Sequence, residues 1–259
     1  MYKEKLLTLD SEIFNNEQIN DFYIYGGSHA KCFIRDHIKY PAFTLYNKHK
    51  SSASMSGLVR YNSTLKYTEE VDELLYKHPQ SFHIFKFGQV DVEYNYYYKI
   101  LKKGEVLDKE DFFTSTISNY IKYLLDHISR KVTNIVVCGS NITSPFEWES
   151  YVKNILKISS IPIGMTYQTK NTDLLKFNEI LRRHCIKNGI VYFDLTEECT
   201  RTNNEGVVLL DQYRGCDHHY AGAEMVRGYN NMIRGNPEYG FNTHYTFVKK
   251  LFQTVQSNF

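Results

Sequence analysis

The chain has 259 residues, 42% of them apolar and 23% charged, which is enough to bury a sizeable core and is ordinary for a soluble globular protein. The net charge of +2 is too small to indicate a nucleic-acid or membrane ligand. Five scattered cysteines without a CxxC pair argue against a disulfide framework or a zinc ribbon. With neither a secretory signal nor a membrane-spanning stretch in the sequence, we expect a cytoplasmic protein.

Short runs rich in Ile, Val, Phe and Tyr predict six strands. They are "FYIYG" (22–26), "AFTLY" (42–46), "FHIFKFG" (82–88), "NIVVCG" (134–139), "IPIGMTY" (161–167) and "IVYFDL" (190–195). Between and after them, helices are predicted over 69–77, 110–129, 173–188 and 221–233, and the ending "LFQTVQSNF" also has a helical pattern. Alternating strands and helices predict an α/β domain with a mostly parallel sheet, whose ligands bind beyond the carboxyl ends of the strands.

The first predicted strand runs into Gly26, Gly27, Ser28 and His29. A serine on a sharp turn between strand and helix exposes its hydroxyl at the sheet edge, and its own backbone N–H can hold an oxyanion. The glycines permit the turn. The same residues also fit a plain helix cap, so Ser28 is either a reactive group or an N-cap.

The second strand is followed by "SSASMSGL", in which Gly57 can bring a backbone N–H close to a ligand. The same small, polar composition is also typical of a plain surface loop. After the fourth strand comes "CGSNITSP", in which Asn141 is a weaker candidate for ligand binding.

The third strand is followed by "GQVDVEYNYYY". The amide of Gln89 can donate to an oxyanion, Asp91 offers a carboxylate, and tyrosines such as Tyr94 can contact a sugar or a base. Alternatively, Asp91 caps a helix and the tyrosines serve packing.

Near the C-terminus, "GCDHHY" places Asp217, His218 and His219 before a predicted helix. A histidine here can act as a general base that the nearby carboxylate orients. The same residues are possible metal ligands, but adjacent residues seldom converge on one ion, so we expect no metal. The other histidines, His29 among them, have no patterned partner and are expected in the core or on the surface.

In order, "YGGSHA", "SSASMSGL", "FGQVDV" and "CDHHY" resemble four sequence blocks of the SGNH/GDSL hydrolase superfamily, over roughly residues 20 to 235. The resemblance implies a three-layer α/β/α, flavodoxin-like fold. We expect one such domain over residues 1–259, which can be part of a longer protein.

The resemblance also implies roles for single residues. Ser28 would be the nucleophile, and Gly57 would donate an oxyanion-hole N–H. Gln89 or Asp91 stands where many members have an oxyanion-hole Asn. His219 is the first choice for the base and His218 the second, with Asp217 as its partner.

Two departures from the family pattern put an ordinary esterase triad in doubt. Gly27 replaces the usual Asp, and Asp217 lies two residues before His219 instead of three.

The sequence is also similar to the N-terminal acetyltransferase domains of nucleotide-sugar enzymes in giant DNA viruses, which N-acetylate viosamine on UDP. This implies an acetyl-CoA-dependent N-acetyltransferase of host cytoplasm, with acetyl-CoA and an amino-sugar nucleotide as its ligands. One alternative is a carbohydrate esterase or deacetylase that uses Ser28, His219 and water. Another is a binding module with an inactive hydrolase fold. Lys99, Lys102 and Lys103 either contact phosphates or form a solvated face.

Overall fold

The structure is a computed structural model. It describes residues 20–34, 37–40, 43–60, 63–143, 148–161, 165–204, 206–215, 219–220 and 237–259.

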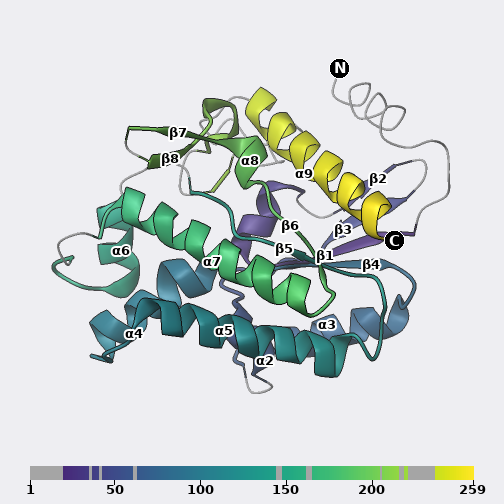
Figure 1. Ribbon diagram of the computed structural model, residues 1–259, viewed down its shortest axis with the longest axis horizontal. Helices are drawn as coiled ribbons and strands as arrows, with labels where there is room; N and C mark the ends of the chain where they lie inside the picture. The colour runs from purple at the N-terminus through teal and green to yellow at the C-terminus, as the bar shows by residue number, and fades with distance from the viewer. Residues whose placement is uncertain are drawn as a thin grey trace.

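A six-stranded sheet with the order β2-β3-β1-β4-β5-β6 runs through the protein (Figure 1). Its strands are β1 (Phe22–Gly26), β2 (His37–Lys39), β3 (Thr44–Asn47), β4 (Phe82–Lys86), β5 (Ile135–Cys138) and β6 (Val191–Phe193). All pairs of neighbouring strands are parallel except β2 and β3. The predicted α/β class with a mostly parallel sheet is confirmed.

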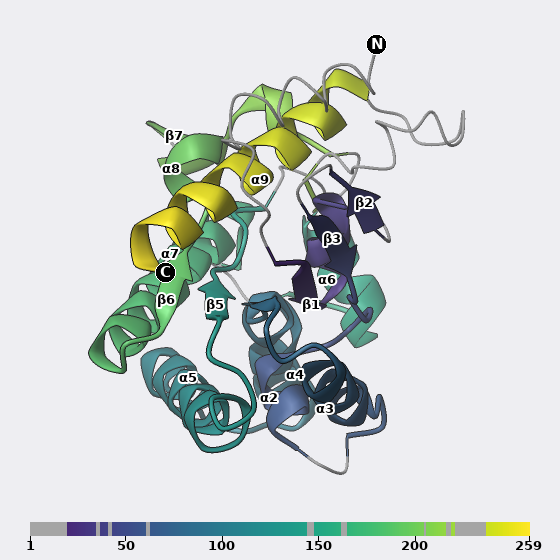
Figure 2. The same ribbon diagram turned by 90° about the vertical axis from the view of Figure 1, so that its right-hand side faces the viewer.

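The sheet is covered on both faces, because successive side chains of a strand point to opposite sides. In β1, Tyr23 and Tyr25 join one buried cluster, whereas Phe22 and Ile24 join the other. The main covering helices are α3 (Tyr67–Lys77), α5 (Lys109–Tyr123) and α7 (Tyr167–Lys187) on the first face and α9 (Pro237–Asn258) on the second. Figure 2 shows α9 and α5 on opposite sides of the strands, which gives three layers.

Shorter elements complete the described part of the chain. They are η1 (Ser28–Cys32), α2 (Met55–Val59), η2 (Asp91–Asn95), α4 (Tyr96–Lys102), η3 (Leu124–Ile128), α6 (Trp148–Leu156), α8 (Thr196–Cys199), η4 (Asp211–Tyr213) and the hairpin β7 (Thr200–Asn203) to β8 (Gly206–Leu209). No helix within the described ranges is both long and apolar enough to cross a membrane. The prediction of a single domain stays a prediction.

The strand predicted over 161–167 is wrong in its described residues, because Tyr167 begins α7. The Thr166 side chain accepts a hydrogen bond from the Thr169 N–H at 3.1 Å, so this helix begins well before the predicted residue 173. Met165, from the apolar run, packs in a small cluster around Trp148 instead of in the sheet. The helix predicted over 221–233 lies outside the described residues.

His83, a buried residue of β4, makes folding stability depend on pH. Its Nε2–H donates to the His78 carbonyl at 2.9 Å, and its Nδ1 accepts from the Tyr25 hydroxyl at 3.0 Å. Burial lowers the pKa of His83 to about 4. An unfolded histidine titrates near pH ~6.5, so between these values the unfolded chain binds more protons than the folded one.

We therefore expect the free energy of unfolding to fall by about 3 kcal/mol from this residue as the pH drops from ~6.5 to ~4. Urea titrations at both ends of this range measure the loss. In His83→Gln this part of the pH dependence should be absent. Equal pH dependence in the wild type and the variant would contradict the assignment.

Candidate active site

Ser28 is the first residue of η1, directly beyond the carboxyl end of β1. A Cβ on Gly26 would lie 2.2 Å from the Lys86 carbonyl oxygen, so only glycine fits where β1 passes β4. Gly27, not Ser28, occupies the N-cap position of η1. The Ser28 Oγ lies instead 2.9 Å from the Nε2 of His219, at hydrogen-bond distance. This geometry favours the reactive interpretation of Ser28 over the capping one.

His219 reaches Ser28 from a position after η4 in the chain. Its neighbour Tyr220 is buried and forms an isolated antiparallel bridge with Arg214. A Cβ on Gly215 would lie 2.3 Å from the His219 carbonyl oxygen, so glycine is needed for this close approach. The local backbone therefore fixes the position from which the imidazole extends.

Two of the predicted residues, Asp217 and His218, lie outside the described residues. Their predicted roles stay predictions. Of the two candidate bases, His219 is the one with a described contact to Ser28.

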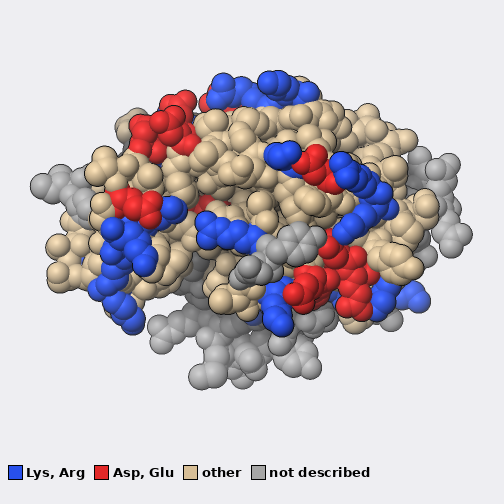
Figure 3. All heavy atoms as spheres, turned by 90° about the horizontal axis from the view of Figure 1, so that it is seen from below, with Lys and Arg blue, Asp and Glu red and all other residues tan. Residues whose placement is uncertain are grey.

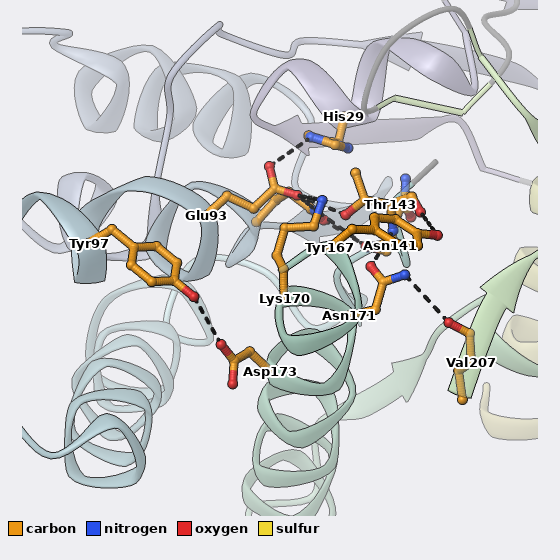
Figure 4. A network of polar contacts seen from close by, with 11 residues as sticks. His29, Glu93, Tyr97, Asn141, Thr143, Tyr167, Lys170, Asn171, Asp173 and Val207 are labelled. Carbon is orange, nitrogen blue, oxygen red and sulfur yellow. Dashed lines mark hydrogen bonds and ion pairs between the residues drawn. The ribbon is translucent and has the colours of Figure 1, made fainter. Parts of the chain in front are cut away.

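The His29 side chain lies beside Ser28 and His219, although no motif in the sequence indicated a partner for His29. Its ring stacks on that of His219, with centroids 4.2 Å apart and planes at 30°. It is 4% exposed, and its Nε2 lies 3.6 Å from the Oε2 of Glu93 (Figure 4). The one sequence feature that could have indicated His29 as a site residue is its position next to Ser28, because both residues follow the end of β1.

Glu93 lies at the centre of a buried polar network (Figure 4). Its Oε1 accepts hydrogen bonds from the Gln89 Nε2 at 2.6 Å and the Thr143 Oγ1 at 3.0 Å, and it lies 3.6 Å from the Lys170 Nζ. Lys170 is fully buried, and its Nζ lies 4.3 Å from the centre of the Trp148 ring. Burial lowers the pKa of Lys170 to about 8, and the nearby Glu93 carboxylate opposes this shift.

Gln89 does not provide the predicted oxyanion-hole donor. Its Nε2 donates to Glu93 and to the Asn141 carbonyl at 3.1 Å, and its Oε1 accepts from the Asn141 N–H at 2.9 Å. An amide has two N–H donors, and both are engaged here. Gln89 thus ties the end of β4 to the end of β5.

Asn141 is 3% exposed, and its side-chain nitrogen has no hydrogen-bond partner in the part of the chain that the structure describes. Its predicted contact with substrate stays a prediction.

Gly57 also differs from the prediction, because the segment expected as a loop folds into α2. Its N–H donates to the Ser54 Oγ at 2.9 Å, which is the N-cap bond of that helix. This N–H is therefore not available to an oxyanion.

Asp91 has a structural task in place of the predicted contact with substrate. Its Oδ2 accepts from the Met55 N–H at 2.8 Å, and its Oδ1 accepts from the Ser56 hydroxyl at 2.5 Å and the Asn95 side chain at 3.0 Å. Burial raises the pKa of Asp91, and these hydrogen bonds oppose the shift. Asp91 thus attaches the first turn of α2 to η2. This agrees with the alternative that Asp91 caps a helix, but the helix whose N–H groups it binds is α2 and not the one in which it lies.

A cavity of about 390 Å³ opens in front of Ser28. It is lined by Ser28, His29, Ser52, Val90, Glu93, Tyr94, Asn95, Tyr151 and Ile155. Tyr94 therefore lies where a substrate contact was predicted, and its role stays a prediction. Ser52, Tyr151 and Ile155 have no sequence signal, because they come from a loop and from α6.

Solved structures resemble the fold, although no protein-family model and no curated protein matches the sequence. Est24, a carbohydrate acetylesterase from Sinorhizobium meliloti, is 12% identical with a TM-score of 0.52 and covers 90% of this chain and 98% of its own. The native aryl esterase of M. smegmatis is 10% identical with a TM-score of 0.52, and the match covers 93% of this chain and 100% of the esterase. A GDSL-like lipase from Bacteroides thetaiotaomicron is 11% identical with a TM-score of 0.50, and the match covers 97% of each chain. The chain therefore has the predicted SGNH/GDSL hydrolase-like fold.

The prediction of an acetyl-CoA-dependent N-acetyltransferase for an amino-sugar nucleotide is wrong. The solved structures of this fold are named as a carbohydrate acetylesterase, an aryl esterase and a GDSL-like lipase, which are hydrolases and not acetyl-CoA-dependent transferases by name. That prediction depended on a Tyr-, Asn- and Lys-rich composition and on departures from the family motifs, neither of which determines the acyl acceptor. The prediction of acetyl-CoA as a ligand is wrong for the same reason.

Proposed function

We propose that the protein is an ester hydrolase that removes small acyl groups, such as acetyl, from a carbohydrate. The single observation that carries this proposal is the 2.9 Å contact between the Ser28 Oγ and the His219 Nε2 at the end of β1. A histidine at this distance can take the hydroxyl proton and activate the serine. The fold likeness to a carbohydrate acetylesterase supports the choice of substrate class.

The reaction has two halves that use the same pair of side chains. The Ser28 Oγ attacks the ester carbonyl carbon while His219 takes its proton; His219 then protonates the sugar oxygen, whose bond to the acyl carbon breaks. Water next attacks the acyl-serine, with His219 again as base. Acetate leaves, and Ser28 regains its proton.

Of the predicted oxyanion donors, the Ser28 backbone N–H fits this mechanism best. It lies at the start of η1, where the N–H groups have no acceptor inside the helix. The side chain of Gln89 and the N–H of Gly57 are occupied by other partners. One such donor typically accounts for about 3 kcal/mol of transition-state stabilisation.

The stacked His29 restricts the orientation of the base. Its ring covers one face of the His219 imidazole, and its Nε2 lies 3.6 Å from the Oε2 of the buried Glu93. His29 and Glu93 also line the cavity, so they bound the space for the acyl group or the sugar. Tyr94 and Tyr151 in the same cavity offer ring faces on which a sugar can stack.

The proposal is tested by incubating the purified protein with p-nitrophenyl acetate and with acetylated oligosaccharides in the absence of CoA. We expect release of acetate from both. Longer acyl chains should react more slowly, because the cavity of about 390 Å³ is small. No hydrolysis of any acyl ester would contradict the proposal and favour a binding module with an inactive hydrolase fold.

A further inference from the structure

A second hollow of about 500 Å³ adjoins the Ser28 cavity, and we call it the extended subsite. Tyr94 and Asn95 line both spaces, so the two lie side by side. An ester whose acyl carbon lies at Ser28 would therefore extend its remaining part past Tyr94 and between α2 and α4.

The extended subsite has an excess of positive charge. Its lining includes Arg60, Lys99 and Lys103 and one carboxylate, Glu105. Glu105 pairs with Lys99 at 3.0 Å. Within the described part of the chain, no carboxylate lies at ion-pair distance from Arg60 or Lys103, both of which are exposed. Figure 3 shows Lys and Arg side chains at the end of the molecule where α4 lies, next to Asp and Glu side chains.

Some lysines elsewhere on the described surface pair with carboxylates. Lys122 pairs with Asp126 at 2.6 Å, and Lys131 pairs with Asp72 at 2.6 Å. Such pairs are the ordinary arrangement of a solvated, charged surface. Arg60 and Lys103 have no such carboxylate partner among the described residues, so no ion pair there neutralises their charges.

A tyrosine platform lies between the unmatched charges and Ser28. The rings of Tyr94 and Tyr98 stack with centroids 5.5 Å apart and planes at 17°. The Lys103 Nζ lies 5.7 Å from the centre of the Tyr98 ring. Aromatic faces of this kind pack against sugar rings, and a cation at the end of the stack would meet an anionic substituent of the sugar.

We propose that the extended subsite binds the anionic group of the substrate, so that the acyl group removed at Ser28 is carried by a sugar with a phosphate or a carboxylate. The guanidinium of Arg60 suits either anion, because its planar donors match two oxygens at once. Lys103 adds a single-point charge beside the tyrosine platform. The identity of the reaction depends on the proposed function, whereas binding of the anion does not.

Calorimetric titration with three sugars tests the inference. The probes are glucose, glucose-6-phosphate and glucuronate, which share a ring and differ in charge and in the type of anion. The proteins are the wild type, the double variant Arg60→Ala/Lys103→Ala, and the control Arg183→Ala/Lys122→Ala. The control removes the same two charge types from exposed positions on α7 and α5 that each have a carboxylate neighbour.

We expect at least one anionic sugar to bind the wild type about tenfold or more tightly than glucose, a preference that rises at low salt. Arg60→Ala/Lys103→Ala should lose that preference and the control should keep it. The stronger of the two anionic probes identifies the anion as phosphate or carboxylate. Equal binding of all three sugars, or an equal loss in the control, would overturn the inference.

Hydrolysis of p-nitrophenyl acetate by the same wild-type sample separates this inference from the proposed function. Anion binding without hydrolysis would reject the esterase and keep the extended subsite. Hydrolysis without any anion preference would reject the extended subsite and keep the esterase.

Discussion

Replacing Ser28 by alanine should lower kcat/KM for acetyl esters by about 10³-fold or more, because the nucleophile of both half-reactions is lost. The fold should survive, since Ser28 is not the N-cap of η1 and its hydroxyl has its described contact with His219. Initial rates with p-nitrophenyl acetate measure the loss, and far-UV circular dichroism checks the fold.

Ser257→Ala is the matched control for this variant. Ser257 lies in the last turns of α9, is exposed, and donates its hydroxyl to the carbonyl of Gln253 within the same helix. Its replacement should leave kcat/KM unchanged. Retention of wild-type activity in Ser28→Ala would contradict the role of Ser28 as nucleophile.

The second large effect should come from Lys170→Met, which we expect to destabilise the protein by about 3–5 kcal/mol. Lys170 is fully buried and lies 3.6 Å from Glu93, which is 6% exposed. Without the ammonium, the Glu93 carboxylate would stay buried without its cation. Denaturant titration at neutral pH measures the change in the free energy of unfolding.

A double variant separates the ion pair from simple packing. Glu93→Gln/Lys170→Met removes both charges, so it should be clearly more stable than Lys170→Met alone. Lys122→Met, at an exposed lysine paired with Asp126, should leave stability nearly unchanged. If the double variant is no more stable than Lys170→Met alone, the buried charge is not the cause of the loss.

The sheet was predictable because its strands are buried on both faces. A run such as Phe22 to Gly26 is apolar throughout and ends in glycine, which is typical of a parallel strand in an α/β fold. The end of that strand then indicated Ser28, and the paired Asp and His motif near the C-terminus indicated His219. The two residues are 191 positions apart, and the structure brings their side chains to 2.9 Å.

The donors of the site could not be predicted in the same way, because each depends on a local partner. Gly57 resembles a loop glycine, but Ser54 caps a short helix there and occupies its N–H. Gln89 resembles an exposed amide, but Glu93, four residues later in the same helical stretch, accepts one of its hydrogens. Four-residue spacing would reveal this pair only once a helix after the third predicted strand is assumed.

The buried polar network of His29, Glu93 and Lys170 could not be predicted from the sequence for a different reason. His29, Glu93 and Lys170 come from η1, η2 and α7, which are distant in sequence and meet only through the packing of the layers. A lone lysine in the first turns of a helix resembles a surface residue. Its burial follows from the contacts of α7 with Trp148 and Glu93.

The most direct measurement is mass spectrometry of the intact protein and its peptides after rapid acid quench of a reaction with p-nitrophenyl acetate. The acyl-serine mechanism predicts a single acetyl group on the peptide that contains Ser28, and this group should be absent in Ser28→Ala. In His219→Gln the acetyl group should accumulate if removal of the base slows hydrolysis of the acyl-serine more than its formation. Hydrolysis that proceeds without acetylated Ser28, or an acetyl group on another residue that turns over at the catalytic rate, would contradict Ser28 as the nucleophile.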